Sequence, residues 1–259
     1  MNLSISNIAW AGEYDEEIYA FLRAEGFGGL EIAPTRLFPD RPYDHLKEAG
    51  DFARGLKAGY GLTICSMQSI WYGLSQNIFG NNEDRAFLLG YTEKAIQFAD
   101  AVGCGNLVFG CPKNRNMPPG GFLPDAYAFF KTIGDIAASH GAVVALEANP
   151  PIYNTNFINT TRDAFDFCRA VSSEGLKVNI DLGTCIFNGE GIELISDNIN
   201  LVNHIHISEP YLVPIKERDL HKDLFKLDYS RYMSIEMANP GDIDTVKAAV
   251  SYVGGLSGS

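Results

Sequence analysis

Short apolar runs alternate with longer amphipathic stretches along this chain, and the pattern repeats about every 30 residues. Most of the apolar runs lack a strict polar–apolar alternation, which is typical of parallel strands covered on both faces. These runs predict eight strands, over residues 3–9, 29–33, 62–67, 106–110, 142–147, 177–181, 202–207 and 233–237. The stretches between them predict helices over residues 15–24, 84–102, 125–139, 161–171 and 242–253, several of which begin with acidic residues and end at glycine.

Strand–helix alternation repeated eight times predicts an α/β protein, a single (β/α)8 barrel (TIM barrel) that forms one domain over residues 1–259. An open, doubly wound sheet is the other arrangement of such a pattern. However, no GxGxxG follows the first predicted strand and no GxxxxGK[ST] occurs in the chain, so nothing indicates a nucleotide-binding fold.

The composition of the chain narrows the range of functions that the protein could have. The formal net charge is −12, with 20 basic and 32 acidic residues, whereas a nucleic-acid-binding protein would gather basic residues on its contact face. No apolar run is long enough for a membrane span, and the N-terminus lacks the basic region of a signal peptide. Five cysteines without a CxxC pair argue against a disulfide framework. We therefore expect a cytoplasmic protein that acts on a small molecule, with no nucleic-acid or membrane partner.

Four polar residues stand at the ends of the last four predicted strands. They are Glu147, Asp181, His206 and Glu236, separated by 34, 25 and 30 residues, each about one strand–helix unit. Barrel chemistry lies at these strand ends, and three carboxylates brought together there would repel one another unless a cation neutralised them. The alternative is a buried ion-pair network. Three oxygen donors and one imidazole predict one divalent metal ion, with Mn²⁺ as the first choice and Mg²⁺, Co²⁺ or Zn²⁺ as alternatives.

Other polar and aromatic residues near the strand ends are candidates for substrate binding. Lys113 and Arg115 could clamp a phosphate or carboxylate, or could form a surface ion pair. The two tryptophans could stack on a sugar ring or pack at the rim. The full set is Trp10, Glu31, Gln68, Trp71, Lys113, Arg115, Asn149, Glu209 and His221.

The segments Ala-Leu-Glu147, Asn-Ile-Asp181, His204-Ile-His206-Ile and Ser-Ile-Glu236-Met make the chain resemble the xylose isomerase-like barrel superfamily over nearly its whole length. This group contains sugar isomerases and epimerases and also apurinic-site endonucleases. In its ketose 3-epimerase members, residues at these four positions bind one divalent metal. The resemblance assigns the catalytic proton transfers to Glu147 and Glu236. It implies a metal-dependent isomerase or epimerase that acts on a sugar, sugar phosphate or keto-sugar derivative through an enediolate.

The chain departs from those epimerases at three positions. It has Tyr153, Thr184 and Leu212 where they carry Glu, His and Arg that grip the polyol end of the sugar, which argues against a free hexulose as substrate. A metal-dependent lyase or dehydratase acting on a keto-sugar or inositol-like compound is an alternative, and so is a non-catalytic barrel. The small number of histidines and the net charge of −12 disfavour an apurinic-site endonuclease. The resemblance also implies a homo-oligomer, either a dimer or a tetramer.

Overall fold

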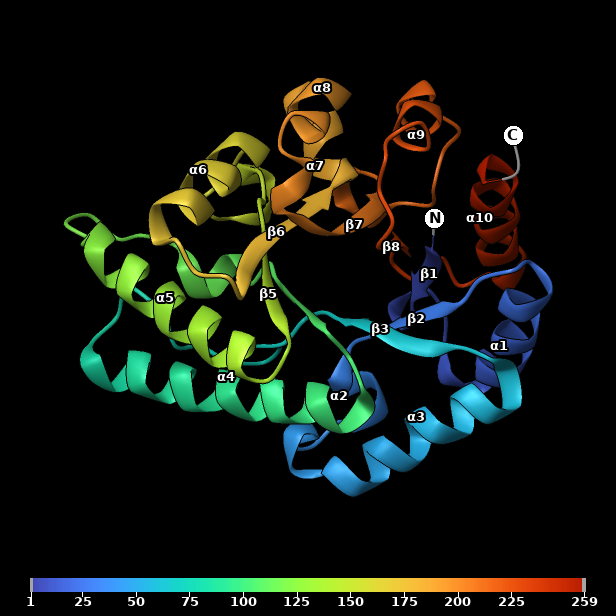
Figure 1. Ribbon diagram of the computed structural model, residues 1–259, viewed down its shortest axis with the longest axis horizontal. Coiled ribbons are helices and arrows are strands. Elements are labelled where there is room, and N and C mark those ends of the chain that lie inside the picture. Colours follow the sequence, from blue (N-terminus) through green and yellow to red (C-terminus); the bar gives the residue numbers. More distant parts are fainter. Residues whose placement is uncertain (1, 258–259) are drawn as a thin grey trace.

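A computed structural model describes residues 2–257, and its eight parallel strands form one closed barrel in chain order (Figure 1). The (β/α)8 prediction is confirmed. The strands are β1 (Asn2–Ser6), β2 (Gly29–Ile32), β3 (Thr63–Met67), β4 (Asn106–Phe109), β5 (Val143–Glu147), β6 (Leu176–Asp181), β7 (Val202–Ser208) and β8 (Tyr232–Glu236). The first strand is shorter than predicted, because the apolar residues that follow it turn into a 3-10 helix, Asn7–Ala9.

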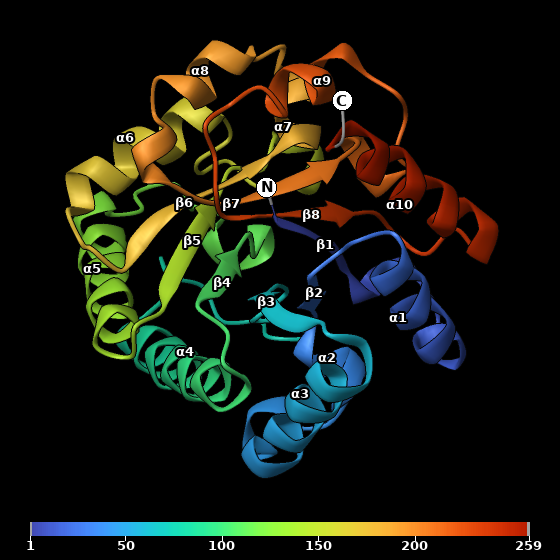
Figure 2. The ribbon, with the colours of Figure 1, turned by 45° about the vertical axis from the view of Figure 1, so that its right-hand side comes forward.

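Helices surround the barrel, and the last of them lies beside the first, where the ring closes (Figure 2). The long helices are α1 (Asp15–Ala24), α3 (Leu46–Tyr60), α4 (Asn82–Val102), α5 (Leu123–Ser139), α6 (Thr161–Val171) and α10 (Ile243–Leu256). Four shorter helices are α2 (Pro34–Leu37), α7 (Leu182–Asn188), α8 (Ile192–Ser196) and α9 (Asp219–Leu224). The sequence pattern had predicted every long helix except α3, in which three glycines weaken the helical signal.

The pairing register brings the predicted ligands to one end of the barrel. Asp181 on β6 pairs with His206 on β7, and Ser208 on β7 pairs with Glu236 on β8. Side chains two residues apart on a strand face the same way, so His206 and Ser208 share a face. The apolar residues between and beside them, such as Ile207, belong to the core.

Polar side chains continue down the interior of the barrel below these ligands. The Ser4 and Ser234 hydroxyls lie 2.5 Å apart, and Asn106 donates to the Ser66 hydroxyl at 2.9 Å. His204 lies 2.8 Å from the same Ser234 hydroxyl. These buried hydroxyl, amide and imidazole groups thus find partners in one another, which makes a polar interior tolerable.

All five cysteines are free, as the sequence predicted. Over residues 2–257, no helix combines the length and the apolar character that crossing a membrane requires.

Candidate functional site

The structure brings Glu147, Asp181, His206 and Glu236 together at the carboxyl ends of β5 to β8. One ligand atom from each lies within 4.8 Å of the others, and none of the four residues is more than 7 % exposed. The Nδ1 atom of His206 is 3.0 Å from Glu147 Oε2 and 3.1 Å from Glu236 Oε2. This spacing fits a shared cation, because oxygen and nitrogen ligands at about 2.0–2.6 Å from one ion lie a few ångströms apart.

Neighbouring amides fix the Glu147 carboxylate. Asn149 donates to Oε1 at 2.8 Å, and Asn179 donates to Oε2 at 2.6 Å. Asn179 pairs in register with Glu147 across the β5–β6 ladder, which sets this contact. Sequence reasoning missed Asn179; its position two residues before Asp181, on the same strand face, is the signal that could have found it.

Asp181 combines two roles. One of its oxygens accepts a hydrogen bond from the Ser208 hydroxyl at 2.5 Å, and the other accepts from the backbone N–H of Thr184 at 2.5 Å. The second bond makes Asp181 the N-cap of α7, where the positive end of the helix favours a carboxylate. The Ser208 contact was not predicted, although Ser208 follows His206 by two residues.

Without a cation, the charges of these residues oppose one another. Burial and the charges of Glu147 and Asp181 raise the pKa of Glu236 to about 7. Burial and the charge of Glu147 raise the pKa of Asp181 to about 6. Burial also acts to raise the pKa of Glu147, but its hydrogen bond with His206 and the His206 charge hold it below its usual value. Although burial favours a neutral ring, the charges of Glu236 and Glu31 raise the pKa of His206 well above its usual value.

A cavity of about 170 Å³ opens above the four residues. Its walls include Glu147, Asp181 and Glu236, with Asn149, Tyr153 and Leu212 on further sides. Gly110 also lines it, and a methyl group there would lie 3.0 Å from Glu147 Oε1, so a larger residue would crowd this carboxylate. The site therefore joins a candidate metal position to a space for a small molecule.

Two of the three residues that depart from the ketose 3-epimerases face this cavity. The Tyr153 hydroxyl accepts a hydrogen bond from the backbone N–H of Tyr211 at 2.9 Å, and Leu212 lies beside them. Burial and the charges of Asp181, Glu236 and Glu147 raise the pKa of Tyr153 to about 12, so its hydroxyl keeps its proton. The Thr184 hydroxyl is instead bound to the Ala148 carbonyl at 3.0 Å.

The candidate substrate residues are not all placed at the cavity. Only Gln68 and Asn149 line it. Trp71 is buried, donates to the Thr92 hydroxyl at 2.9 Å and packs edge-on against Phe109. Trp10 is bound to Asp15 at 2.8 Å and lies beneath the Arg36 guanidinium.

The basic candidates also lie off the cavity. Lys113 is exposed and lines a neighbouring depression. Arg115 is fully buried and donates from Nη2 to Asn149 Oδ1 at 2.6 Å, while its Nε and Nη1 have no protein partner. Burial lowers the pKa of Arg115 to about 10, against the opposing effect of the Glu147 charge. Arg115 therefore supports Asn149, which in turn holds Glu147.

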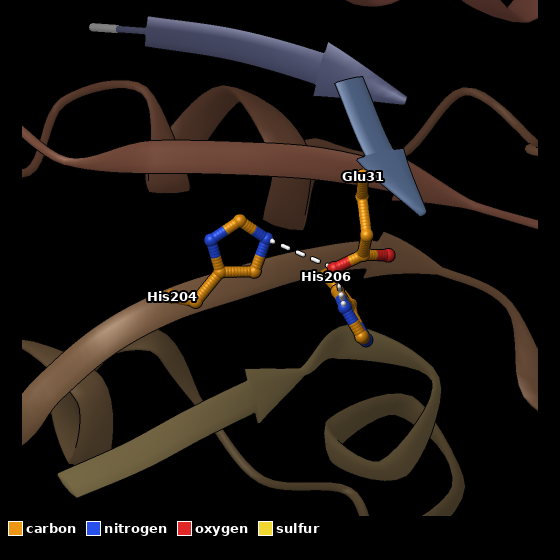
Figure 3. A group of neighbouring side chains, drawn as sticks. All are labelled: Glu31, His204 and His206. Atoms are coloured by element: carbon orange, nitrogen blue, oxygen red, sulfur yellow. Dashed lines mark hydrogen bonds and ion pairs between the residues drawn. The ribbon is translucent and has the colours of Figure 1, made fainter. Parts of the chain in front are cut away.

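The remaining candidates are buried in other contacts. Glu209 forms an ion pair with Arg218, whose Nε lies 2.6 Å from its Oε1. His221 Nδ1 lies 3.1 Å from the Tyr252 hydroxyl. Glu31 is fully buried and lies against His204 and His206 (Figure 3).

This barrel and its cluster of carboxylates and imidazole define a class of protein. The family described as xylose isomerase-like TIM barrel matches residues 19–252, and the chain belongs to this family. No sequence among the curated proteins matches the chain.

Solved structures share its backbone at low sequence identity. The 3-keto-D-glucoside 4-epimerase of E. coli is 18 % identical, with a TM-score of 0.77 over 98 % of each chain. The D-psicose 3-epimerase of Clostridium cellulolyticum H10 is 15 % identical, with a TM-score of 0.79 over 99 % of this chain and 98 % of the other. The probable 3-DHS dehydratase of Bacillus anthracis is 17 % identical, with a TM-score of 0.74 over 98 % of each chain. At these identities the likeness establishes the fold.

We expect Glu236→Gln to stabilise the metal-free protein at pH 8 and to destabilise it relative to wild type once Mn²⁺ is added. A carboxyl with a raised pKa keeps, in the folded state, a proton that the unfolded chain has released. Its ionisation therefore destabilises the fold as the pH rises from 4.5 to about 7. The full effect for Glu236 is about 3 kcal/mol in the free energy of unfolding.

Urea unfolding with a chelator, at pH 5 and at pH 8, measures this difference. The advantage of the variant should shrink toward pH 5, and the exposed substitution Glu174→Gln serves as the control. Equal stability of wild type and Glu236→Gln at pH 8, with and without Mn²⁺, would contradict a repulsive site that a cation relieves.

Proposed function

We propose that this protein is a divalent-metal-dependent isomerase or epimerase that transfers a proton within a sugar-type substrate. One observation carries the proposal. Glu147 and Glu236, from strands β5 and β8, line one cavity and both reach the Nδ1 atom of His206, at 3.0 and 3.1 Å. Two carboxylates beside one cation position are suited to remove and return a proton next to a carbonyl.

A bound cation would withdraw electrons from the carbonyl and neighbouring hydroxyl of the substrate and balance negative charge on oxygen. Glu147, Asp181, His206 and Glu236 would hold it. In our proposal one glutamate takes the proton from carbon and the other supplies a proton.

We propose Mn²⁺ as the ion, because three carboxylate oxygens and one imidazole suit it and leave room for substrate oxygens. Mg²⁺, Co²⁺ and Zn²⁺ are the alternatives. Metal analysis of the protein as purified, followed by reconstitution with each ion, tests this choice.

The walls of the cavity support a small, neutral keto-sugar derivative as substrate. No Lys or Arg is among the described residues that line it, so a phosphate would find no cationic partner there. Tyr153 and Leu212 replace the charged residues expected to grip a polyol. The net charge of −12 further supports a small molecule over nucleic acid. Assembly as a dimer or tetramer and a cytoplasmic location stay predictions.

The test is proton exchange in deuterated water. We expect the Mn²⁺-loaded protein to place deuterium on a carbon next to the carbonyl of a keto-sugar without releasing water from the sugar. NMR of the product measures this exchange. Glu147→Gln and Glu236→Gln should each reduce the exchange rate at least about 100-fold, because each removes one proton-transferring group.

Glu174→Gln, an exposed substitution of the same kind, is the control for this experiment. Metal content measured in parallel separates loss of the cation from loss of proton transfer. Release of water from the substrate would instead identify the protein as a lyase or dehydratase. Exchange that persists in both glutamine variants would refute the assignment.

Removal of the Tyr153 hydroxyl tests the proposed substrate contact. Since this oxygen accepts from the Tyr211 N–H, its own hydrogen is available to a ligand in the cavity. Tyr153→Phe should raise KM about fivefold, as expected for the loss of one neutral hydrogen bond. Metal content should not change. The control is Tyr211→Phe, on an exposed neighbouring residue, which should leave KM unchanged. If KM were the same in Tyr153→Phe as in wild type, the result would argue against the proposed substrate contact.

A further inference from the structure

Glu31 is a carboxylate buried inside the barrel, away from the cavity. It stands on β2, is 0 % exposed and reaches toward two histidines of β7 (Figure 3). Its Oε2 lies 3.0 Å from His206 Nε2 and 3.4 Å from His204 Nε2. Its Oε1 accepts from Gln68 Nε2 at 3.3 Å. Among the described residues, these two histidines are its only ion-pair partners, so its position has to be explained through them.

The two ring nitrogens of His206 face different groups. Nδ1 faces Glu147 and Glu236, the side on which the candidate cation lies. Nε2 faces Glu31. A neutral imidazole carries one hydrogen, and its other nitrogen offers the lone pair that binds a metal. Nδ1 can therefore bind the cation only in the form that carries its hydrogen on Nε2.

We propose that Glu31 is a positioning residue for the metal centre. Its carboxylate accepts a hydrogen bond from the Nε2–H of His206, and this bond presents the Nδ1 atom of His206 to the cation. The proposal rests on the metal site proposed above. Carboxylates behind a metal-bound histidine fix the orientation of the ring and make it a stronger ligand. Glu31 does not contact the substrate cavity in this arrangement, and its effect passes through His206.

The surroundings of Glu31 hold it in place for this role. Gln68 binds its second oxygen and is itself bound to the Ser6 hydroxyl at 2.7 Å. On the other side, His204 Nε2 lies 2.8 Å from the Ser234 hydroxyl and also faces Glu31. The Glu31 carboxylate is thus held from both sides, so it cannot rotate freely toward another partner.

The same three side chains could instead surround a second cation, because ligand atoms from Glu31, His204 and His206 lie within 4.8 Å of one another. The distances favour the hydrogen bond. His206 Nε2 is already 3.0 Å from the carboxylate, and it cannot both bind a metal and carry the hydrogen that leaves Nδ1 free for the first site. The two arrangements differ in stoichiometry, with one ion per chain in our proposal and two in the alternative.

The experiment measures the Mn²⁺ dissociation constant of the full chain by titration calorimetry, with elemental analysis for stoichiometry. Glu31→Leu, which removes the acceptor, should weaken Mn²⁺ binding about 10- to 100-fold. Glu31→Gln should weaken it less, because its amide oxygen still accepts from Nε2–H. Thr92→Val, which removes the hydroxyl bound by Trp71 at a buried place away from the site, is the control for general destabilisation and should bind Mn²⁺ as wild type does.

A second readout reports the hydrogen itself and does not depend on activity. In protein labelled with ¹⁵N-histidine and loaded with diamagnetic Zn²⁺, the His206 Nε2 should carry a hydrogen that exchanges slowly with water. Glu31→Leu should make that exchange fast, and Glu31→Gln should largely restore slow exchange.

The outcomes separate this proposal from the one on which it rests. Equal Mn²⁺ affinity in wild type, Glu31→Gln and Glu31→Leu would overturn the role of Glu31 and leave the metal site intact. Two ions per wild-type chain, with one lost in Glu31→Leu, would replace it with a second metal site. A wild-type chain that binds no cation would overturn the metal site itself, and the role of Glu31 with it.

Discussion

Three carboxylates, on Glu147, Asp181 and Glu236, share a buried space with a single imidazole, and their repulsion governs the rest of the site. The barrel imposes this arrangement, because the pairing register places Asp181 beside His206 and Glu236 beside Ser208. Burial strengthens the repulsion, since there is little water to screen it. Burial raises the pKa values of Asp181 and Glu236, and the charges of the neighbouring carboxylates raise them further. A divalent cation would relieve the repulsion while keeping every carboxylate ionised.

The hydrogen bonds around the four residues are unequal, and this inequality bears on their roles. Glu147 accepts from two amides, and Asp181 from a hydroxyl and a helix N-terminus. Among the described residues, Glu236 has His206 as its only polar side-chain partner. A carboxylate with few hydrogen bonds keeps more of its basicity and more freedom to turn, which are useful in a group that receives a proton from carbon. In the proposed reaction, Glu236 is therefore the better suited of the two glutamates to take the proton from carbon, which leaves Glu147 to supply one.

The sequence was enough to predict the barrel and the four clustered residues, because both depend on regular spacing. Apolar runs one unit apart mark the strands, and a polar residue at the end of each of the last four strands marks the mouth of the barrel. What it could not predict depends on distances across the barrel. Glu31 lies 175 residues from His206 in the chain, and no local sequence pattern indicates that its carboxylate reaches the Nε2 atom of His206. Arg115 is a similar case, because a basic residue after a strand suggests a surface clamp, whereas the following 3-10 helix turns it inward toward Asn149.

In the proposed chemistry, the metal centre would carry out the proton transfer, and the cavity walls would select the substrate. The proposed proton transfer would use the cation and the two carboxylates whatever the rest of the substrate, so the centre alone would not distinguish one keto-sugar from another. In the proposed reaction, discrimination would come from the other cavity walls, which include Tyr153 and Leu212. An aliphatic side chain cannot hydrogen-bond a hydroxyl, and burying one against it without a partner is unfavourable. A ligand with few free hydroxyls on that side would therefore bind better than an open polyol, and a change of two wall residues could alter the substrate without changing the proton-transfer machinery.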